Sequence, residues 1–383
     1  MSLIYFDNAA STPIDSRVLE SMMPYFCIDY GNPSSIHPMG IRAHNAIENA
    51  RESLATLLGC QSDEIVFTSG GTEADNLAIV GVANAYSNRG HHIITSEIEH
   101  HAVLETCHHL EKLGWRITYL AVDNKGQVSP QALERAITSD TVLVTIMTAN
   151  NVVGTLQPIS EIGSVCHKHG VIFHTDAVQM IGHLPLDVKK TQLDLLSLSG
   201  HKFSGPKGVG ALYVSKEISL YPMIFGGGQE EGFRSGTENV PGIVGLGKAA
   251  EIARAEMIDD SKRIKDLATK LINGIISKIP HTTLNGHEVH RLPTNINISF
   301  EGVEGEYLCK ELAKRGLCVS TGSACSSNTH EAPYVLLSMG VERELANCSI
   351  RMSLGKANSE SELESSLEIL REVVANIRSY SFV

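Results

Sequence analysis

Residues 199–210 read Ser-Gly-His-Lys-Phe-Ser-Gly-Pro-Lys-Gly-Val-Gly, a polar and glycine-rich stretch. The apolar runs on either side of it, 193–198 and 210–214, predict two strands of a buried sheet. Lys202 therefore places a primary amine on the connection between two core strands. By itself, a lysine in such a loop is more commonly a solvated side chain, so its meaning depends on the other motifs of the chain.

Asp176 supplies the second half of a chemical pattern, because it follows the apolar, strand-like run 171–174. A lysine and an aspartate at neighbouring strand ends suit the chemistry of pyridoxal phosphate (PLP). The amine of Lys202 forms a Schiff base with the aldehyde of PLP, and the carboxylate keeps the pyridine nitrogen protonated, so that the ring accepts electrons. The sequence thus predicts a PLP site, with a solvated loop lysine as the alternative.

Helix-like and strand-like patterns alternate from about residue 40 to residue 215. This alternation predicts an α/β layer structure with a mainly parallel, seven-stranded sheet that is buried on both faces. The strand-like runs cover residues 65–68, 93–95, 117–121, 142–147, 171–174, 193–198 and 211–214. The amphipathic helical stretches cover residues 43–58, 73–86, 102–112, 130–137 and 159–169.

The remainder of the chain has a pattern of its own. It holds helical stretches at 242–278 and 360–378 and strand-like runs at 294–300, 318–320 and 349–353. We interpret this as a second, smaller α+β domain. The first 15 residues carry only one short apolar run, so we expect this N-terminal arm to return to the smaller domain. The expected division is a large PLP-binding domain at 16–262 and a small domain at 1–15 and 263–383.

Charge and cysteine content exclude several classes of function. The chain has 31 basic and 43 acidic residues and a net charge of −12, whereas nucleic-acid-binding surfaces need clustered Lys and Arg. No apolar run approaches the roughly 18 residues of a membrane span, and the N-terminus lacks a secretory pattern. The eight cysteines form no C-x-x-C pair, which argues against an iron–sulfur or zinc ligand set. We expect a cytoplasmic protein with free thiols, without membrane, nucleic-acid or metal binding.

Residues 68–72 read Thr-Ser-Gly-Gly-Thr and lie between a predicted strand and a predicted helix. Small residues at a helix N-terminus let backbone N–H groups approach an anion, and the helix dipole favours negative charge. Gly71 and Thr72 are therefore candidates for holding a phosphate group. A plain N-cap at Thr72, followed by the acidic Glu73, explains the same letters equally well.

Two further polar segments follow predicted strands. His100 and His101 precede a helix, where an imidazole can stack on a bound ring, move protons or cap the helix. A metal site among the six histidines between 91 and 109 is not expected, because no carboxylate or cysteine completes a ligand spacing. Asn151 follows the run 142–147, and its amide can donate to an anionic oxygen or form a turn.

Cys325 lies within residues 319–328, Val-Ser-Thr-Gly-Ser-Ala-Cys-Ser-Ser-Asn, where almost nothing apolar would bury it. We expect a mobile, exposed loop whose thiol is either a nucleophile or an accidental surface group. Arg351 lies in the strand-like alternation 349–355. If the apolar face of that strand is buried, Arg351 points at a cleft, where its guanidinium can bind a carboxylate through two parallel hydrogen bonds; otherwise it faces solvent.

Together these segments resemble the cysteine desulfurases, the NifS-like group of PLP enzymes with the aspartate-aminotransferase fold (PLP fold type I). The resemblance covers nearly the whole chain, and its motifs occur in the same order, which makes the set far more specific than any one of them. The motifs are residues 5–10 (Tyr-Phe-Asp-Asn-Ala-Ala), 31–35 (Gly-Asn-Pro-Ser-Ser), 68–73, 99–100 (Glu-His), 150–151, 176–179 (Asp-Ala-Val-Gln), 199–202, 234–237 (Arg-Ser-Gly-Thr), 322–325 (Gly-Ser-Ala-Cys) and 349–351 (Ser-Ile-Arg).

The resemblance implies a role for each matching residue. The catalytic residues would be Lys202 as Schiff-base lysine, Cys325 as sulfur-accepting nucleophile and His100 stacked on the ring. The other cofactor contacts would come from Gly71, Thr72, Ser199 and His201 at the phosphate, Asp176 at the pyridine nitrogen, Gln179 at the ring oxygen, and Asn151. Thr237 would reach the phosphate of a second subunit, which implies a homodimer. Asn32, Asn151 and Arg351 would bind the substrate.

The implied reaction converts L-cysteine to L-alanine. Lys202 removes the α-proton, the protonated ring stabilises the carbanion, and the thiolate of Cys325 takes the sulfur as a persulfide for a sulfur-acceptor protein. One alternative is an aminotransferase or lyase of the same fold. An alternative of another class is a non-catalytic sulfur-relay or partner-binding subunit.

Two positions and the short C-terminal tail depart from the pattern of many relatives. Val152 stands where they carry glutamate, and Glu231 where they often carry arginine. Only five residues follow Arg378, whereas relatives that serve an iron–sulfur scaffold often have a longer extension. The resemblance therefore leaves open whether the sulfur goes to iron–sulfur clusters, tRNA, DNA or a cofactor pathway.

Overall fold

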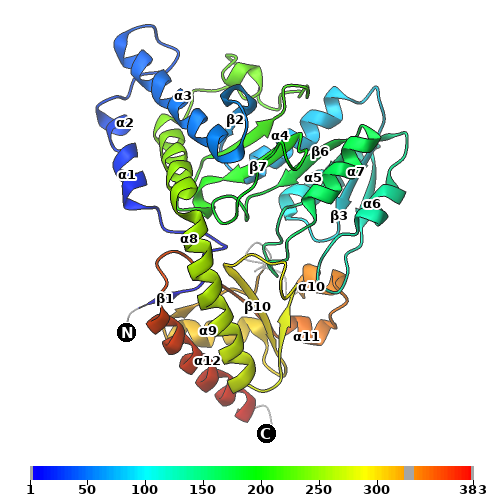
Figure 1. The fold of residues 1–383 in the computed structure, drawn as a ribbon, viewed down its shortest axis with the longest axis vertical. Helices are drawn as coiled ribbons and strands as arrows, with labels where there is room; N and C mark the ends of the chain where they lie inside the picture. The colour runs from blue at the N-terminus through cyan, green and yellow to red at the C-terminus, as the bar shows by residue number, and fades with distance from the viewer. Residues whose placement is uncertain (1–2, 323–331, 381–383) are drawn as a thin grey trace.

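The structure, a computed structural model, describes residues 3–322 and 332–380. Figure 1 shows a larger part built on a seven-stranded sheet and a smaller part below it, with the long helix α8 (Val240–Lys278) running through both. The predicted α/β fold class is confirmed. Helix α8 continues through residue 262, so no break in the secondary structure marks the domain boundary expected there. That boundary stays a prediction.

The large sheet has the strand order β2-β8-β7-β6-β5-β3-β4. Strand β8 pairs antiparallel with β2 and β7, and the other neighbouring pairs are parallel. The strands are β2 (Ile65–Thr68), β3 (His92–Ser96), β4 (Arg116–Leu120), β5 (Thr141–Thr145), β6 (Ile172–Asp176), β7 (Leu195–Ser199) and β8 (Gly210–Val214). All seven predicted runs form strands, although Asp176 is the last residue of β6 instead of following it.

Helices cover both faces of this sheet. Successive side chains of each strand point to opposite faces, so neighbouring apolar residues pack against different helices. Phe67 and Val144 pack with α3, α6, α7 and α8 on one face. Their neighbours Val66 and Leu143 pack with α4 and α5 on the other face. The helices of the larger part besides α8 are α1 (Ser16–Met22), α2 (Pro24–Cys27), α3 (Pro38–Leu58), α4 (Gly71–Ala85), α5 (His101–Lys112), α6 (Pro130–Ala136) and α7 (Ile159–His169).

The smaller part has an antiparallel sheet of order β12-β10-β9 and a core of its own. Its strands are β9 (Thr282–Asn285), β10 (Asn295–Phe300) and β12 (Ser349–Ser353), and its helices are α9 (Gly305–Lys314), α10 (Tyr334–Ser338), α11 (Arg343–Asn347) and α12 (Glu360–Tyr380). Strand β9 was not predicted, because Leu284 is its only strongly apolar residue.

The N-terminal arm returns to the smaller part, as the sequence predicts. Strand β1 (Ile4–Tyr5) pairs parallel with β11 (Leu317–Cys318), and Ile4 and Phe6 are buried in the core of the smaller part. Asp7 then forms an isolated parallel bridge with Ser353. The arm therefore enters the region between the two parts at Asp7.

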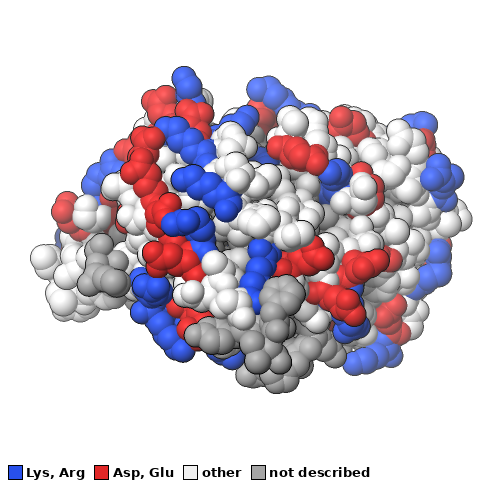
Figure 2. All heavy atoms as spheres, turned by 90° about the horizontal axis from the view of Figure 1, so that it is seen from below, with Lys and Arg blue, Asp and Glu red and all other residues white. Residues whose placement is uncertain are grey.

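The surface carries mixed charge. On the face that Figure 2 shows, Lys and Arg side chains are interspersed with Asp and Glu, and the visible basic groups do not merge into one continuous patch. Among the described residues, no helix is both long enough and apolar enough to cross a membrane.

A buried ion pair fixes the loop between β8 and α8. The guanidinium of Arg51 on α3 donates to both carboxylate oxygens of Glu230, at 2.9 and 2.8 Å, and the Phe67 N–H donates to the same carboxylate at 2.7 Å. The side chains of Arg51 and Glu230 are only 12% and 3% exposed. Glu230 and Glu231 both adopt left-handed backbone conformations, with φ of 50° and 52°. The buried ion pair and the hydrogen bond from the Phe67 N–H on β2 hold this strained turn in place.

Replacing Glu230 with alanine should lower the free energy of unfolding by about 3–5 kcal/mol, because the guanidinium of Arg51 stays buried without its counter-charge. Urea denaturation of the purified protein measures the change. Glu48→Ala is the matched control, since Glu48 contacts the same arginine at 3.1 Å with a side chain that is 45% exposed. The control should cost less than about 1 kcal/mol. Equal losses in the two variants would contradict the assignment.

Candidate active site

A cavity of about 290 Å³ lies at the carboxyl ends of β6 and β7, where the smaller part meets the large sheet. Its lining brings together ten of the residues singled out in the sequence: Gly71, Thr72, His100, Asn151, Asp176, Gln179, Ser199, His201, Lys202 and Arg351. They come from helix termini, strand ends and loops that span most of the chain. The cavity also receives Ala9 and Ala10 of the N-terminal arm.

Two described residues singled out in the sequence, Asn32 and Thr237, do not line this cavity, and a third residue is not described. Asn32 is exposed, and its side-chain oxygen accepts a hydrogen bond from the Ser34 N–H at 2.9 Å. Thr237 is exposed on the loop that Glu230 fixes. Cys325 lies outside the described residues.

Asp176 occupies the end of β6 with 6% of its surface exposed. One of its oxygens accepts a hydrogen bond from the Val178 N–H at 2.9 Å. Burial raises the pKa of this carboxyl, and the nearby His100 and Lys202 partly offset the effect. A cationic N–H donor stabilises the anionic form of such a buried carboxylate. Asp176 is therefore a suitable partner for a protonated pyridine nitrogen.

His100 serves as the N-cap of α5, and its Nδ1 accepts a hydrogen bond from the Ala102 N–H at 3.1 Å. The helix-cap interpretation is therefore correct, and the ring also lines the cavity. Burial lowers the pKa of His100, so the imidazole is uncharged near neutral pH. An uncharged flat ring in the cavity wall fits stacking on an aromatic cofactor.

The start of α4 forms the candidate phosphate cradle. The helix begins at Gly71, and its N-cap is Gly70, which makes no side-chain capping hydrogen bond. The interpretation of Thr72 as the N-cap is therefore wrong. A Cβ atom on Gly71 would lie 2.6 Å from a methyl carbon of Val178. Glycine at this position lets the helix terminus lie against the loop after β6 while its N–H groups remain available to an anion.

Lys202 ends a single 3₁₀ turn, Gly200–Lys202, that directly follows β7. Its Nζ donates to the carbonyl oxygens of Ala9 and Ala10, at 2.7 and 3.0 Å. The side chain of Gln179 donates to the same Ala9 oxygen at 3.1 Å. The N-terminal arm thus supplies acceptors to the residue on which the chemistry is expected to depend.

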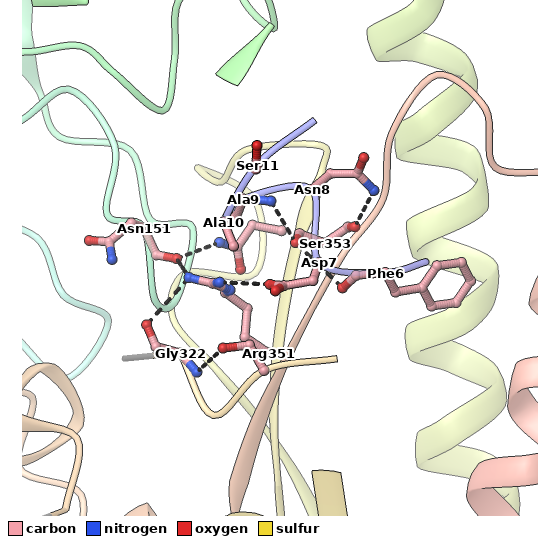
Figure 3. A network of polar contacts seen from close by, with 12 residues as sticks. Phe6, Asp7, Asn8, Ala9, Ala10, Ser11, Asn151, Gly322, Arg351 and Ser353 are labelled. Atoms are coloured by element: carbon pink, nitrogen blue, oxygen red, sulfur yellow. Dashed lines mark hydrogen bonds and ion pairs between the residues drawn. The ribbon is translucent and has the colours of Figure 1, made fainter. Parts of the chain in front are cut away.

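Arg351 is buried, so the interpretation of it as a solvent-facing strand arginine is wrong. All five residues of β12 are buried, because the arm and residue 320 bridge to it. Figure 3 shows its guanidinium between three segments of the chain. Nη1 donates to the carbonyl oxygens of Asn151 at 2.9 Å and Gly322 at 3.3 Å, and Nη2 donates to Asp7 Oδ1 at 2.9 Å.

Two buried polar atoms at this end of the cavity have no protein partner among the described residues. They are Nε of Arg351, a donor, and Oδ1 of Asn151, an acceptor. Buried polar groups without partners are costly, so such atoms indicate a place for a bound polar group. An amino-acid carboxylate matches the arginine donor.

Two buried acids near the cofactor residues, Asp75 and Glu99, were given no role in the sequence analysis. Asp75 on α4 is 1% exposed, and its Oδ1 lies 3.7 Å from His174 Nε2 and has no hydrogen-bond partner among the described residues. Burial and the charge of Asp176 raise its pKa well above the usual range. Ligand atoms of Asp75, His100 and Asp176 lie within 4.8 Å of one another, close enough to hold a cation. A pyridinium nitrogen is the cation that the other cavity residues fit. The only sequence signal for Asp75 is an acidic residue near the start of α4, a helix that also carries the acidic Glu73.

Glu99, the second of these acids, fixes the strand ends beside His100. Its carboxylate accepts from the Ser96 hydroxyl at 2.6 Å and from the Met147 N–H at 3.0 Å to each oxygen. Complete burial raises the pKa of Glu99 to about 8. The fold therefore keeps this acid largely protonated at neutral pH, next to the residue that lines the cavity.

Stability should depend on pH through Glu99. The unfolded chain releases this proton near pH 4.5 and the folded protein only near pH 8, so the contribution of Glu99 to stability falls between these values and then levels off. Glu99→Gln removes this titration, and its stability relative to the parent protein should rise from pH 5 to pH 8. Urea midpoints at several pH values measure this, with the exposed Glu105→Gln as control. A pH-independent difference between Glu99→Gln and the parent would contradict the assignment.

Comparison with known proteins agrees with this geometry. The sequence profile of the class-V aminotransferases matches residues 4–365. A protein of Methanosarcina thermophila named cysteine desulfurase IscS is 51% identical, over 99% of this chain and 93% of its own length. A solved structure titled NifS-like protein superposes with a TM-score of 0.92 at 41% identity, over 98% of this chain and 100% of that one. Another, titled SspA in complex with cysteine, gives 0.82 at 40% identity, over 93% of this chain and 100% of that one.

The match is at the level of both sequence and fold, over nearly the full length of each chain. Class-V aminotransferases depend on PLP, and the cavity offers this chain's residues in the arrangement that such a cofactor needs. The chain belongs to the class-V aminotransferase family and, within it, to the NifS-like cysteine desulfurases.

Proposed function

We propose that this protein removes sulfur from L-cysteine, leaving L-alanine, and carries the sulfur on Cys325 to an acceptor. The observation that carries the proposal is that the two ends of the cavity hold different chemical groups. One end has a half-buried lysine and a buried aspartate, and the other has an arginine with an unused donor. The relatives named cysteine desulfurase, and the neighbour whose title includes bound cysteine, support the choice of substrate.

When bound, PLP supplies an aldehyde for covalent attachment and a ring that accepts the electrons released at the substrate α-carbon. Lys202 would carry the cofactor, Asp176 would hold its ring nitrogen, and His100 and Gln179 would lie against the ring. The start of α4 with Ser199 and His201 would hold the phosphate. Burial, with the nearby Lys202 and Lys207, lowers the pKa of His201 to about 4.

The remaining steps belong to the chain's own residues. Arg351 and Asn151 orient the substrate carboxylate, which fixes the α-hydrogen relative to the amine of Lys202. As a free amine, Lys202 takes the α-proton. The carbonyl oxygens of Ala9 and Ala10 accept hydrogen bonds from its Nζ, and such bonds favour the ammonium form that results.

Cys325 would then take the sulfur. Its thiolate attacks the substrate sulfur; an S–S bond forms as the substrate Cβ–S bond breaks, and the electron pair stays with the three-carbon product, which leaves as alanine after protonation. Gly322 lines the cavity, and Cys325 follows three residues later in the sequence, outside the described residues.

Incubation with L-cysteine should add one sulfur atom to the peptide that contains Cys325, as measured by mass spectrometry, with alanine released. Lys202→Ala should abolish both products, because no amine remains to hold the cofactor or remove the proton. Cys325→Ala should stop alanine release when no thiol acceptor is supplied. Continued release from Cys325→Ala would instead favour an aminotransferase or lyase of this fold. A protein that stays colourless after PLP is added would favour a non-catalytic subunit.

We also propose a homodimer in which Thr237 reaches the partner's cofactor. Two observations support it. Thr237 is exposed and lies outside the cavity of its own chain. Large apolar side chains are exposed in two segments, residues 26–41 and 221–225. Ile36 in the first is 94% exposed and Phe225 in the second is 70% exposed, and Phe225 lies on the same loop as Thr237. Surface of this kind is typical of protein–protein contacts.

The protein should run at about twice 41.4 kDa in light scattering coupled to size exclusion. Ile36→Ser and Phe225→Ser should each shift the mass toward the single-chain value, because they remove apolar area from the contact. Ile258→Ser on α8 is the matched control, since Ile258 is also 70% exposed and lies outside both segments. A single-chain mass for the parent protein would reject the dimer.

A sulfur-acceptor protein and a cytoplasmic location complete the proposal. The seven cysteines that the structure describes are all free, which favours a reducing compartment. The mixed charge of the face in Figure 2 and the net charge of −12 favour a protein acceptor over direct binding of nucleic acid.

A further inference from the structure

Asp7 brings a carboxylate from the N-terminal arm to the substrate end of the cavity. Its Oδ1 lies 2.9 Å from Nη2 of Arg351, whose side chain is 3% exposed, while that of Asp7 is 21% exposed. In Figure 3 the two side chains point toward each other, with the arm on one side and Gly322 on the other. This pair joins residues that are 344 positions apart in the sequence.

The donors of Arg351 can be counted. A guanidinium carries five N–H groups, two on each terminal nitrogen and one on Nε. Nη1 serves two carbonyl oxygens, Nη2 serves Asp7, and Nε has no partner among the described residues. The donors that remain are Nε–H and one N–H of Nη2. Nε and Nη2 lie on the same edge of the guanidinium, and a carboxylate binds such an edge through parallel hydrogen bonds.

The carboxylate of Asp7 is not needed to hold the arm in place. The neighbouring Asn8 donates from its side chain to the Ser353 carbonyl at 2.8 Å, and the Ala9 N–H donates to the Ser353 hydroxyl at 2.8 Å. The Ser353 N–H in turn donates to the Phe6 carbonyl at 2.7 Å. The backbone of the arm is thus held by hydrogen bonds on both sides of Asp7. The carboxylate of Asp7 forms its ion pair with Arg351.

We propose that Asp7 is a positioning residue for the substrate carboxylate. It offsets the charge of the buried guanidinium and holds Nη2 so that the fork of Nε–H and Nη2–H is presented to the cavity. The inference rests on the proposed function, in which Arg351 binds the carboxylate of L-cysteine. Asp7 itself does not touch the substrate.

The proposal predicts an effect that depends on the carboxylate. In Asp7→Ala, kcat/KM for L-cysteine should fall about tenfold through KM, as expected for a weakened charge-assisted fork. For L-cysteine methyl ester, which lacks the anionic carboxylate, kcat/KM should change less than about twofold. Asp7→Asn keeps an acceptor oxygen and should stay within about threefold of the parent protein for both compounds.

A second readout does not depend on turnover. The dissociation constant of L-alanine, followed by the absorption of the bound cofactor, should rise about tenfold in Asp7→Ala. In a double-mutant cycle with Arg351→Lys, the two changes should not add, because Asp7 acts through the guanidinium. Asn8→Ala is the matched control: it loosens the same arm without touching Arg351, so it should lower the melting temperature and leave the ratio of acid to ester unchanged.

Three outcomes would overturn the proposal. Equal losses for acid and ester in Asp7→Ala would make Asp7 a purely structural residue. A lower KM for L-cysteine would make it a competing anion. Additive effects with Arg351→Lys would place its action elsewhere. If Asp7→Ala does not fold, Asp7→Glu carries the same test, because its carboxylate is displaced by one methylene and should raise KM for the acid alone. A parent protein that forms no alanine from L-cysteine would instead reject the proposed function, and L-alanine binding would still report on Asp7.

Discussion

One buried guanidinium joins the parts of this molecule at its active cavity. Arg351 bonds to the N-terminal arm through Asp7, to the loop after β5 through Asn151, and to the segment before Cys325 through Gly322. A buried charge is tolerated only where counter-charge and acceptors surround it. All three segments therefore meet at a single buried side chain in the wall of the cavity.

Polar contacts between the two parts reinforce this arrangement. The side chain of Asn295 donates to the Asn151 carbonyl at 3.0 Å, and that of Asn297 donates to the Val152 carbonyl at 3.3 Å. Val152, where many relatives carry glutamate, is 2% exposed and packs with Val335 and Leu336 in an apolar cluster. The substitution therefore exchanges a charge for packing and leaves the backbone contacts of the loop in place. Glu231 is exposed, in contrast to its buried neighbour Glu230, so this departure changes surface charge alone.

Much of the fold could be predicted because strands buried on both faces appear as continuous apolar runs. Lys202 and Asp176 could be found because they stand at the ends of such runs. The partners of Arg351 could not, since a contact between positions 7 and 351 leaves no trace in local spacing. Thr72 was open to misinterpretation because Gly70 and Thr72 are both acceptable helix starts, and only the backbone path decides between them. Asp75 and Glu99 were missed because burial, which gives them their chemistry, is a property of the assembled structure.

The use of the first residues of the chain beside β12 has a consequence for biosynthesis. Asp7, Ala9 and Ala10 emerge from the ribosome long before Arg351 is synthesised. The large sheet can therefore assemble before the cavity has the part of its lining that Arg351 supplies. Contacts of such long sequence separation form late, because the chain entropy of closing the loop must be overcome first. The pair of Asp7 and Arg351 is therefore completed only when synthesis is nearly finished.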